Sequence, residues 1–231
     1  MKLVHPLFSK PICFKENIVP VLILEEPIAF RSLTTELIRQ SEGESGEFVL
    51  SINDKPIDCA DHMNVFYDYA HLDDVEKRLQ TKAMNSLIRN TQETMADETF
   101  RLSLAIREYM AKLAALSDHP VSYEQGENLS ALLKAMEFRV DLAGLSPCEA
   151  LYEQMLLIHS LSKGQCFVLI NAHSFFGKQE LEKLYKMIQY RKIPMMLMEN
   201  HAVSNHHPCE KVTLFDEDMC ELSLDSNQEI D

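Results

Sequence analysis

The sequence predicts an α/β protein with a long helical region in the middle of the chain. Residues 166–200 contain two short apolar runs, at 166–170 and 194–198, on either side of a segment with helical periodicity. Within residues 178–192 the apolar residues recur at i, i+3, i+4 and i+7, the spacing of one helix face. This order predicts a βαβ unit with two buried parallel strands.

The second observation is that residues 57–119 contain neither glycine nor proline. Apolar residues there follow helical spacing, so we expect long helices that form a separate lobe. Short apolar runs and turn residues predict the remaining elements. Before the helical region we expect strands at 3–4, 12–14 and 18–24, a helix at 28–40 and a strand at 48–52. After it we expect a helix at 129–136, a strand at 138–142, a helix at 147–161, and edge strands at 212–215 and 220–224.

These elements divide the chain into an α/β head and a helical leg. We expect the first part of the head at 1–58, the leg at 59–118 with an outer limit near residue 160, and the second part of the head at 119–225. We expect residues 226–231 to be a disordered tail.

Composition restricts the classes of function. The net charge is −14, and residues 209–231 hold eight acids against the single base Lys211. Such a chain does not coat nucleic acid non-specifically, although a local basic lining is compatible with it. No apolar run reaches the roughly 20 residues that span a bilayer, and the N-terminal residues lack a signal-peptide core. We therefore expect a cytoplasmic protein without a membrane segment, whose six scattered cysteines are reduced.

The loop after the first strand of the βαβ unit is the place where many α/β enzymes hold a phosphate. Residues 171–177 read Asn-Ala-His-Ser-Phe-Phe-Gly, which matches neither GxxxxGK[ST] nor GxGxxG. We therefore expect no bound nucleotide. Asn171 and Glu199 end the two strands, and we interpret both as structural hydrogen-bonding residues.

Order and spacing over nearly the whole chain carry a family resemblance, which is strongest between residues 132 and 222. Its main segments are Ile-Leu-Glu at 23–25, Leu-Leu-Lys at 132–134, Phe-Arg-Val-Asp at 138–141, Phe-Val-Leu-Ile-Asn at 167–171 and Leu-Met-Glu at 197–199. With the central helices, this pattern resembles the DNA-end-binding ring protein family of type II-A CRISPR spacer acquisition. No short diagnostic motif contributes to it.

The resemblance implies a degenerate P-loop-NTPase-like head with an inserted all-helical leg domain. It implies a ring-shaped homotetramer that binds calcium and holds the ends of double-stranded DNA in a basic central hole. It further implies a non-enzymatic role in spacer acquisition for antiviral defence, beside the CRISPR integrase proteins and the RNA-guided effector nuclease.

Basic residues are the candidates for contacting DNA phosphates. The family pattern carries basic residues at Arg101, Lys134 and Arg139. Others on the predicted helices are Lys77, Arg78, Lys82, Arg89, Arg107 and Lys112. The competing interpretation is that each of these charges belongs to an ordinary solvated helix face.

Calcium requires six to eight oxygen ligands, often from several carboxylates. The family places an acidic cluster at the turn that holds Asp118, Glu124 and Glu127. This chain departs from the pattern, because the other expected acidic positions are taken by Pro120, Ser122 and Gln125. The three acids are therefore either calcium ligands or solvated turn residues.

Two other sites and two other functions stay open as alternatives. A zinc site at His201, His206, His207 and Cys209 competes with a structural loop, since the spacing matches no standard finger. A nucleophile at Ser174 beside His173 lacks the GxSxG elbow. The alternative functions are a divergent nucleotide hydrolase that uses residues 171–177 and a protein-binding scaffold with an acidic C-terminal segment.

Overall fold

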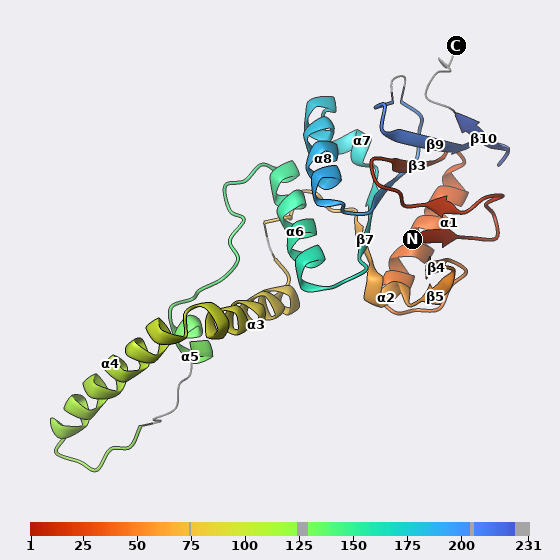
Figure 1. The fold of residues 1–231 in the computed structure, drawn as a ribbon. Helices are drawn as coiled ribbons and strands as arrows, with labels where there is room; N and C mark the ends of the chain where they lie inside the picture. The colour runs from red at the N-terminus through yellow and green to blue at the C-terminus, as the bar shows by residue number, and fades with distance from the viewer. Residues whose placement is uncertain (74, 124–128, 204–205, 225–231) are drawn as a thin grey trace. The chain divides into compact units, whose positions relative to one another are not determined.

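The computed structural model describes residues 1–73, 75–123, 129–203 and 206–224. The chain divides into two compact units, shown in Figure 1. The first, which we call the α/β unit, consists of Met1–Asp74 and Leu142–Asp231, and the second, the helical unit, is Val75–Asp141. Together the described residues form two sheets and eight helices, as expected for the α/β class.

A six-stranded main sheet is the centre of the α/β unit. Its strands lie in the order β10 (Glu221–Leu224), β9 (Glu210–Phe215), β3 (Val19–Leu24), β8 (Met195–Glu199), β7 (Cys166–Ile170) and β6 (Met63–Phe66). All neighbouring strands are parallel except β10, which runs antiparallel to β9. Strands β3, β7 and β8 are buried along their whole length, which explains their continuous apolar sequences.

A smaller antiparallel sheet and several helices complete this unit. The small sheet has the order β2 (Ile12–Cys13), β1 (Lys2–Val4), β4 (Val49–Ile52) and β5 (Lys55–Ile57). Its side chains pack with helix α1 (Pro27–Ser41), the short α2 (Cys59–His62) and one face of the main sheet. Helices α6 (Pro147–Leu161) and α8 (Lys178–Arg191) lie on the opposite side of that sheet (Figure 1).

The predicted βαβ unit is confirmed. Strands β7 and β8 are parallel neighbours, with Phe167 opposite Met195, and α8 connects them. The predicted helix at 147–161 is also confirmed. It begins with a capping box, in which Ser146 Oγ accepts from the Glu149 N–H and the Glu149 carboxylate accepts from the Ser146 N–H.

Four local predictions were wrong. Residues 63–66 form β6, which pairs with β7, although the sequence placed the start of the helical leg at residue 59. Residues 138–142 form no strand, because the Gln80 side chain takes up both backbone groups of Val140, at 2.7 and 2.9 Å. Strand β9 is not at an edge, since β3 flanks it. A short helix, α7 (Ala172–Phe175), interrupts the loop after β7.

The helical unit contains α3 (Lys77–Thr94), α4 (Ala96–Ala115) and α5 (Leu129–Ala135). Helices α3 and α4 are separated at Met95, whose backbone leaves the helical conformation. Among the described residues of this unit, only Val75 and Ala83 are buried apolar residues. In the described part of the whole chain, no helix is long and apolar enough to cross a membrane.

Candidate functional site

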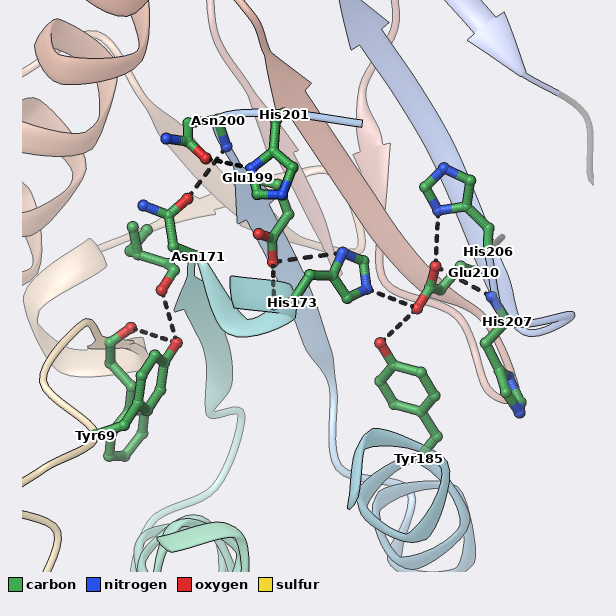
Figure 2. A network of polar contacts seen from close by, with 12 residues as sticks. Tyr69, Asn171, His173, Tyr185, Glu199, Asn200, His201, His206, His207 and Glu210 are labelled. Atoms are coloured by element: carbon green, nitrogen blue, oxygen red, sulfur yellow. Dashed lines mark hydrogen bonds and ion pairs between the residues drawn. The ribbon is translucent and has the colours of Figure 1, made fainter. Parts of the chain in front are cut away.

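A buried polar network lies where the βαβ unit meets β9 (Figure 2). Its members come from separate elements: His173 from α7, Tyr185 from α8, Glu199 from the end of β8, Glu210 from the start of β9, and His206 from the preceding loop. Glu199 and Glu210 are both buried. A carboxylate in such a place needs hydrogen-bond donors, because burial disfavours its charge.

Glu210 is well supplied with donors. Its Oε1 accepts from the Tyr185 hydroxyl at 2.6 Å and lies 3.1 Å from Nε2 of His173. Its Oε2 lies 3.0 Å from Nδ1 of His206 and accepts from the His207 N–H at 3.3 Å. Burial alone would raise the pKa of Glu210, but the bonds from His173, His206 and Tyr185 outweigh it and lower the pKa to about 2. Glu210 is therefore ionised across the physiological range.

Glu199 is supplied less well. Its Oε1 accepts from the His173 N–H at 3.1 Å, while its Oε2 has no hydrogen-bond partner in the described structure. Burial raises the pKa of Glu199 to about 7, against the lowering effects of the charge on His173 and of backbone N–H groups. The two carboxyl groups of one network thus differ widely in proton affinity, because only Glu210 has side-chain donors.

His173 links the two carboxyl groups. Its Nε2 faces Glu210 at 3.1 Å, and its Nδ1 lies 3.8 Å from Oε1 of Glu199. Burial works to lower the pKa of His173, but the hydrogen bond and charge of Glu210, together with the charge of Glu199, raise it. The pKa values of His173 and Glu199 are thus both shifted upward, so each group binds a proton more readily than it would in an exposed position.

The loop after β7 is held by hydrogen bonds within the chain. Asn171 takes a left-handed conformation with φ 53°, and its Oδ1 accepts from the Asn200 N–H at 3.1 Å. The N–H groups that start the two following helices are bonded to carboxylates of the chain itself: His173 to Glu199, and Gly177 to Glu180 at 2.8 Å. These carboxylates occupy the donors that a phosphate would need and repel its charge.

The basic residues of the helical unit form a different kind of surface. On α3, Arg78, Lys82 and Arg89 are exposed and fall within about 40° of one another around the helix axis, over about 16 Å. No ion pair involving these three residues occurs in the described part of the chain. We call this set the α3 basic stripe.

Comparison with known proteins adds a family to this geometry. Residues 40–219 match the family model described as CRISPR-associated protein (Cas_Csn2). The chain belongs to this Cas_Csn2 family. The resemblance inferred from the sequence is thereby confirmed, and the family assigns the chain to CRISPR-based defence. A search of curated proteins found no match.

In this Cas_Csn2 chain the predicted DNA contacts do not all share one face. Arg101 and Lys112 are exposed and lie on one side of α4, three turns apart. Arg107 is half-buried on another side, where it lines a cavity of about 750 Å³ between α3, α4 and α5. Lys134, in the last turn of α5, and Arg139, in the following loop, are exposed. Their roles in binding DNA stay predictions.

The predicted metal ligands are only partly placed. Asp118 is exposed in the loop after α4, and Glu124 and Glu127 lie outside the described residues. Across the residues with assigned positions, no three His, Cys, Asp or Glu side chains form a group that could hold a metal ion.

The histidines and cysteine weighed as a zinc site have separate partners. His201 Nδ1 contacts Asn200 at 2.7 Å, His206 faces Glu210, and His207 Nδ1 lies 3.0 Å from Sγ of Cys209. One ring nitrogen of each histidine thus lies within hydrogen-bond distance of another side chain of the protein.

Sequence reasoning identified the edge of the sheet but missed the network. It interpreted Glu199 correctly as a hydrogen-bonding residue, yet did not connect it with His173 or Glu210. One signal was available: Tyr185 occupies the apolar face of the predicted helix, and a buried tyrosine needs a partner for its hydroxyl. Only the tertiary structure shows that this partner is Glu210.

Proposed function

We propose that this chain binds the ends of double-stranded DNA during spacer acquisition, as a calcium-dependent, ring-shaped tetramer in the cytoplasm that catalyses no reaction. Its partners in this role are the CRISPR integrase proteins and the RNA-guided effector nuclease. Membership of the Cas_Csn2 family supports the CRISPR setting. The α3 basic stripe is the observation that best supports DNA binding.

The stripe suits sequence-independent contact with a phosphate backbone. Arg78, Lys82 and Arg89 present three cations along one side of a helix, and α3 carries only one acid, Glu93. Lysine and arginine that contact phosphates release counterions and so contribute affinity that falls with salt. In a symmetric assembly the same stripe recurs in every subunit, so a chain with net charge −14 still offers several basic surfaces.

Calcium binding and assembly of several subunits are consistent with the same proposal. A divalent cation at Asp118 and neighbouring acids would reduce the repulsion between an acidic protein and DNA. Large apolar side chains such as Leu116 and Met136 are exposed on the helical unit, as expected for a surface that another subunit covers. The proposed role without catalysis is supported by the carboxylates that occupy the loop after β7.

The decisive experiment compares linear and closed circular duplexes of equal length in a mobility-shift assay. With calcium, the linear duplex should bind and the circle should not, because a ring that holds ends needs an end to enter. A chelator should weaken binding. Equal binding to both forms of DNA would contradict the proposal.

A matched pair of triple variants tests the stripe. Arg78→Glu, Lys82→Glu and Arg89→Glu together should weaken binding at least about tenfold and reduce the slope of log affinity against log salt by about 3. The control combines Lys178→Glu, Lys183→Glu and Arg191→Glu on α8, which changes the net charge equally. An equal loss in both variants would show that overall charge, and not the stripe, governs binding.

The nucleotide-hydrolase alternative is tested separately. We expect no heat of binding when ATP and magnesium are titrated into the chain, since Glu199 and Glu180 already accept from backbone N–H groups after β7. Magnesium-dependent ATP turnover that is lost in Glu199→Gln would overturn the non-catalytic part of the proposal.

A further inference from the structure

A second basic site lies on the α/β unit, far along the sequence from the α3 basic stripe. It is a pocket of about 170 Å³, and three exposed lysines, Lys10, Lys15 and Lys211, are among the residues that line it. We call this the lysine pocket. In the described part of the chain, none of the three lysines forms an ion pair. Their positive charges are therefore available to a ligand.

The walls of the lysine pocket come from two separate parts of the fold. One wall belongs to the main sheet, where the register of β3 and β9 sets Pro20 beside Lys211. The other belongs to the N-terminal segment 8–18, whose Ile12 and Ile18 also line the pocket. Pro20 and Ile12 are buried and Ile18 is half-buried, whereas the lysines are exposed. The pocket thus has an apolar interior and a basic rim.

The acids beside the pocket are already bonded within the chain. Glu221 lines the pocket, and its Oε2 and Oε1 accept from the Ser9 N–H at 2.7 Å and from the Ser9 hydroxyl at 2.8 Å. Glu16, the neighbour of Lys15 in the sequence, forms an ion pair with Lys192 at 3.0 Å. Three lysines against one carboxylate leave the pocket with a surplus of positive charge.

Size and charge together define the ligand. An apolar cavity of about 150 Å³ holds one benzene molecule, so the lysine pocket has room for one aliphatic or aromatic side chain. The surrounding ammonium groups attract carboxylates on either side of that side chain. A phosphodiester backbone suits the pocket less well, because it has no apolar group to fill the interior. In addition, no arginine is among the described residues that line the pocket, so a phosphate would lack a bidentate partner.

We propose that the lysine pocket binds a short acidic segment of a partner protein, whose single large apolar side chain enters the pocket. Aspartate or glutamate residues on both sides of this side chain face Lys10, Lys15 and Lys211. Such a contact covers little area, and its exposed ion pairs are screened by salt, so it is reversible and sensitive to ionic strength. The inference does not depend on DNA binding by the α3 basic stripe.

Synthetic peptides test the proposal on the full chain. The probes are fluorescein-labelled Ser-Glu-Asp-Leu-Asp-Glu-Ser and the same peptide with phenylalanine at its centre, and fluorescence anisotropy at low salt measures their binding. One control peptide has serine at the centre, and the other has glutamine and asparagine in place of the acids. Each control should bind at least about tenfold more weakly than the probes, because it lacks either the buried apolar group or the charges. Failure of both probes to bind, or equal binding of probes and controls, would overturn the proposal.

A matched pair of triple variants locates the binding site. Lys10→Gln, Lys15→Gln and Lys211→Gln together should weaken binding of the probes at least about tenfold. The control variant changes the net charge equally at three exposed lysines elsewhere on the α/β unit, namely Lys163→Gln, Lys178→Gln and Lys183→Gln. Equal losses in the two variants would contradict the proposal. Circular dichroism establishes that both variants are folded.

Lysine acetylation of the native chain supplies an independent readout. A limiting amount of an N-hydroxysuccinimide ester modifies exposed lysines, and peptide mass spectrometry measures the rate at each position. The bound probe should slow modification of Lys10, Lys15 and Lys211 several-fold and leave the three control lysines unchanged. Protection of other lysines alone would show that the peptide binds elsewhere and would overturn the proposal.

Competition with DNA separates this site from the proposed function. The linear duplex should not displace the probe, and the pocket variant should bind this duplex as well as the control variant does. Displacement of the probe by the duplex would show that the pocket contacts phosphates, and would overturn the proposal of a protein ligand. A chain that binds the probe but no DNA would contradict the proposed function and support this inference.

Discussion

The two units of this chain differ in how much of their apolar and polar surface is buried. The α/β unit encloses two carboxyl groups, and Glu199 has no exposed surface at all. The helical unit leaves large apolar side chains in solvent, with Leu116 exposed by 81%, Met136 by 72% and Tyr109 by 63%. Burial of apolar surface is the main source of stability, so the α/β unit is equipped to fold alone. The helical unit has little buried apolar surface of its own, since only Val75 and Ala83 are buried apolar residues in its described part.

The first test of this contrast removes Glu210, a buried carboxylate with several hydrogen-bond partners. We expect Glu210→Ala to lower the free energy of unfolding by about 4 kcal/mol, because it leaves Tyr185, His173 and His206 without their shared acceptor. Urea unfolding at pH 7 measures the change. Glu182→Ala, which removes a partly exposed carboxylate from α8, should cost less than about 1 kcal/mol. Similar losses in both variants would show that the network contributes no special stability.

The second test compares the same substitution in the two units. Leu169→Ala in β7 should cost about 3 kcal/mol, because Leu169 is completely buried and its removal leaves a cavity. Leu116→Ala at the end of α4 should change the free energy of unfolding by less than about 0.5 kcal/mol in the isolated subunit. Denaturation at several protein concentrations measures whether the cost of Leu116→Ala depends on assembly. A cost for Leu116→Ala that grows with concentration would show that assembly covers this side chain.

The third test uses pH. Folded Glu199 has a pKa of about 7 against an ordinary value of 4.5, so between these pH values the folded state binds more protons than the unfolded state. The free energy of unfolding should therefore fall as pH rises from 4.5 to 7. Glu199→Gln keeps an acceptor for the His173 N–H but has no charge, so it should be more stable than the native chain by roughly 2 kcal/mol at pH 8. At pH 5 the two proteins should be nearly equal.

The other members of the network act in different pH ranges. The lowered pKa of Glu210 contributes stability above pH 4.5, which is lost as pH falls toward 2. The raised pKa of His173 contributes stability below pH 6.5, which is lost as pH rises through the folded value. Unfolding curves from pH 3 to 9 should thus show a maximum in weakly acidic solution. A stability curve for Glu199→Gln that is parallel to the native curve would contradict the assignment to Glu199.

The two units also differ in how much of their secondary structure the sequence predicts. The βαβ unit was predictable because buried strands and an amphipathic helix leave strong periodic signals at 166–170 and 178–192. Strand β6 was not, since four residues without flanking glycine or proline resemble a helix segment. The false strand at 138–142 was apolar enough to pair, but Gln80 satisfies its backbone instead.

The polar network shows the limit for the candidate site. Sequence places Glu199 and Asn171 at the ends of strands, because such positions follow from local pattern. It does not place Glu210 beside His173, since these residues are 37 positions apart and the pairing depends on how β9 joins the sheet. In the helical unit the basic residues were visible from composition, but the faces that carry Arg101 and Arg107 became clear only when the exact helix was known.

The smallest expected effect concerns the helix ends of the two units. Helix α6 has a complete capping box, whereas Glu76, the residue that precedes α3, forms no side-chain cap and has a non-helical backbone, with φ −50° and ψ 136°. Ser146→Ala should destabilise the α/β unit by about 1 kcal/mol. Glu76→Asp keeps the charge but brings an oxygen within reach of the first turn, so it should stabilise α3 by about 0.5 kcal/mol. Hydrogen exchange of α3 amides measures this gain, and Glu76→Gln is the control that adds no cap. If both substitutions slow exchange equally, then capping is not what limits the helical unit.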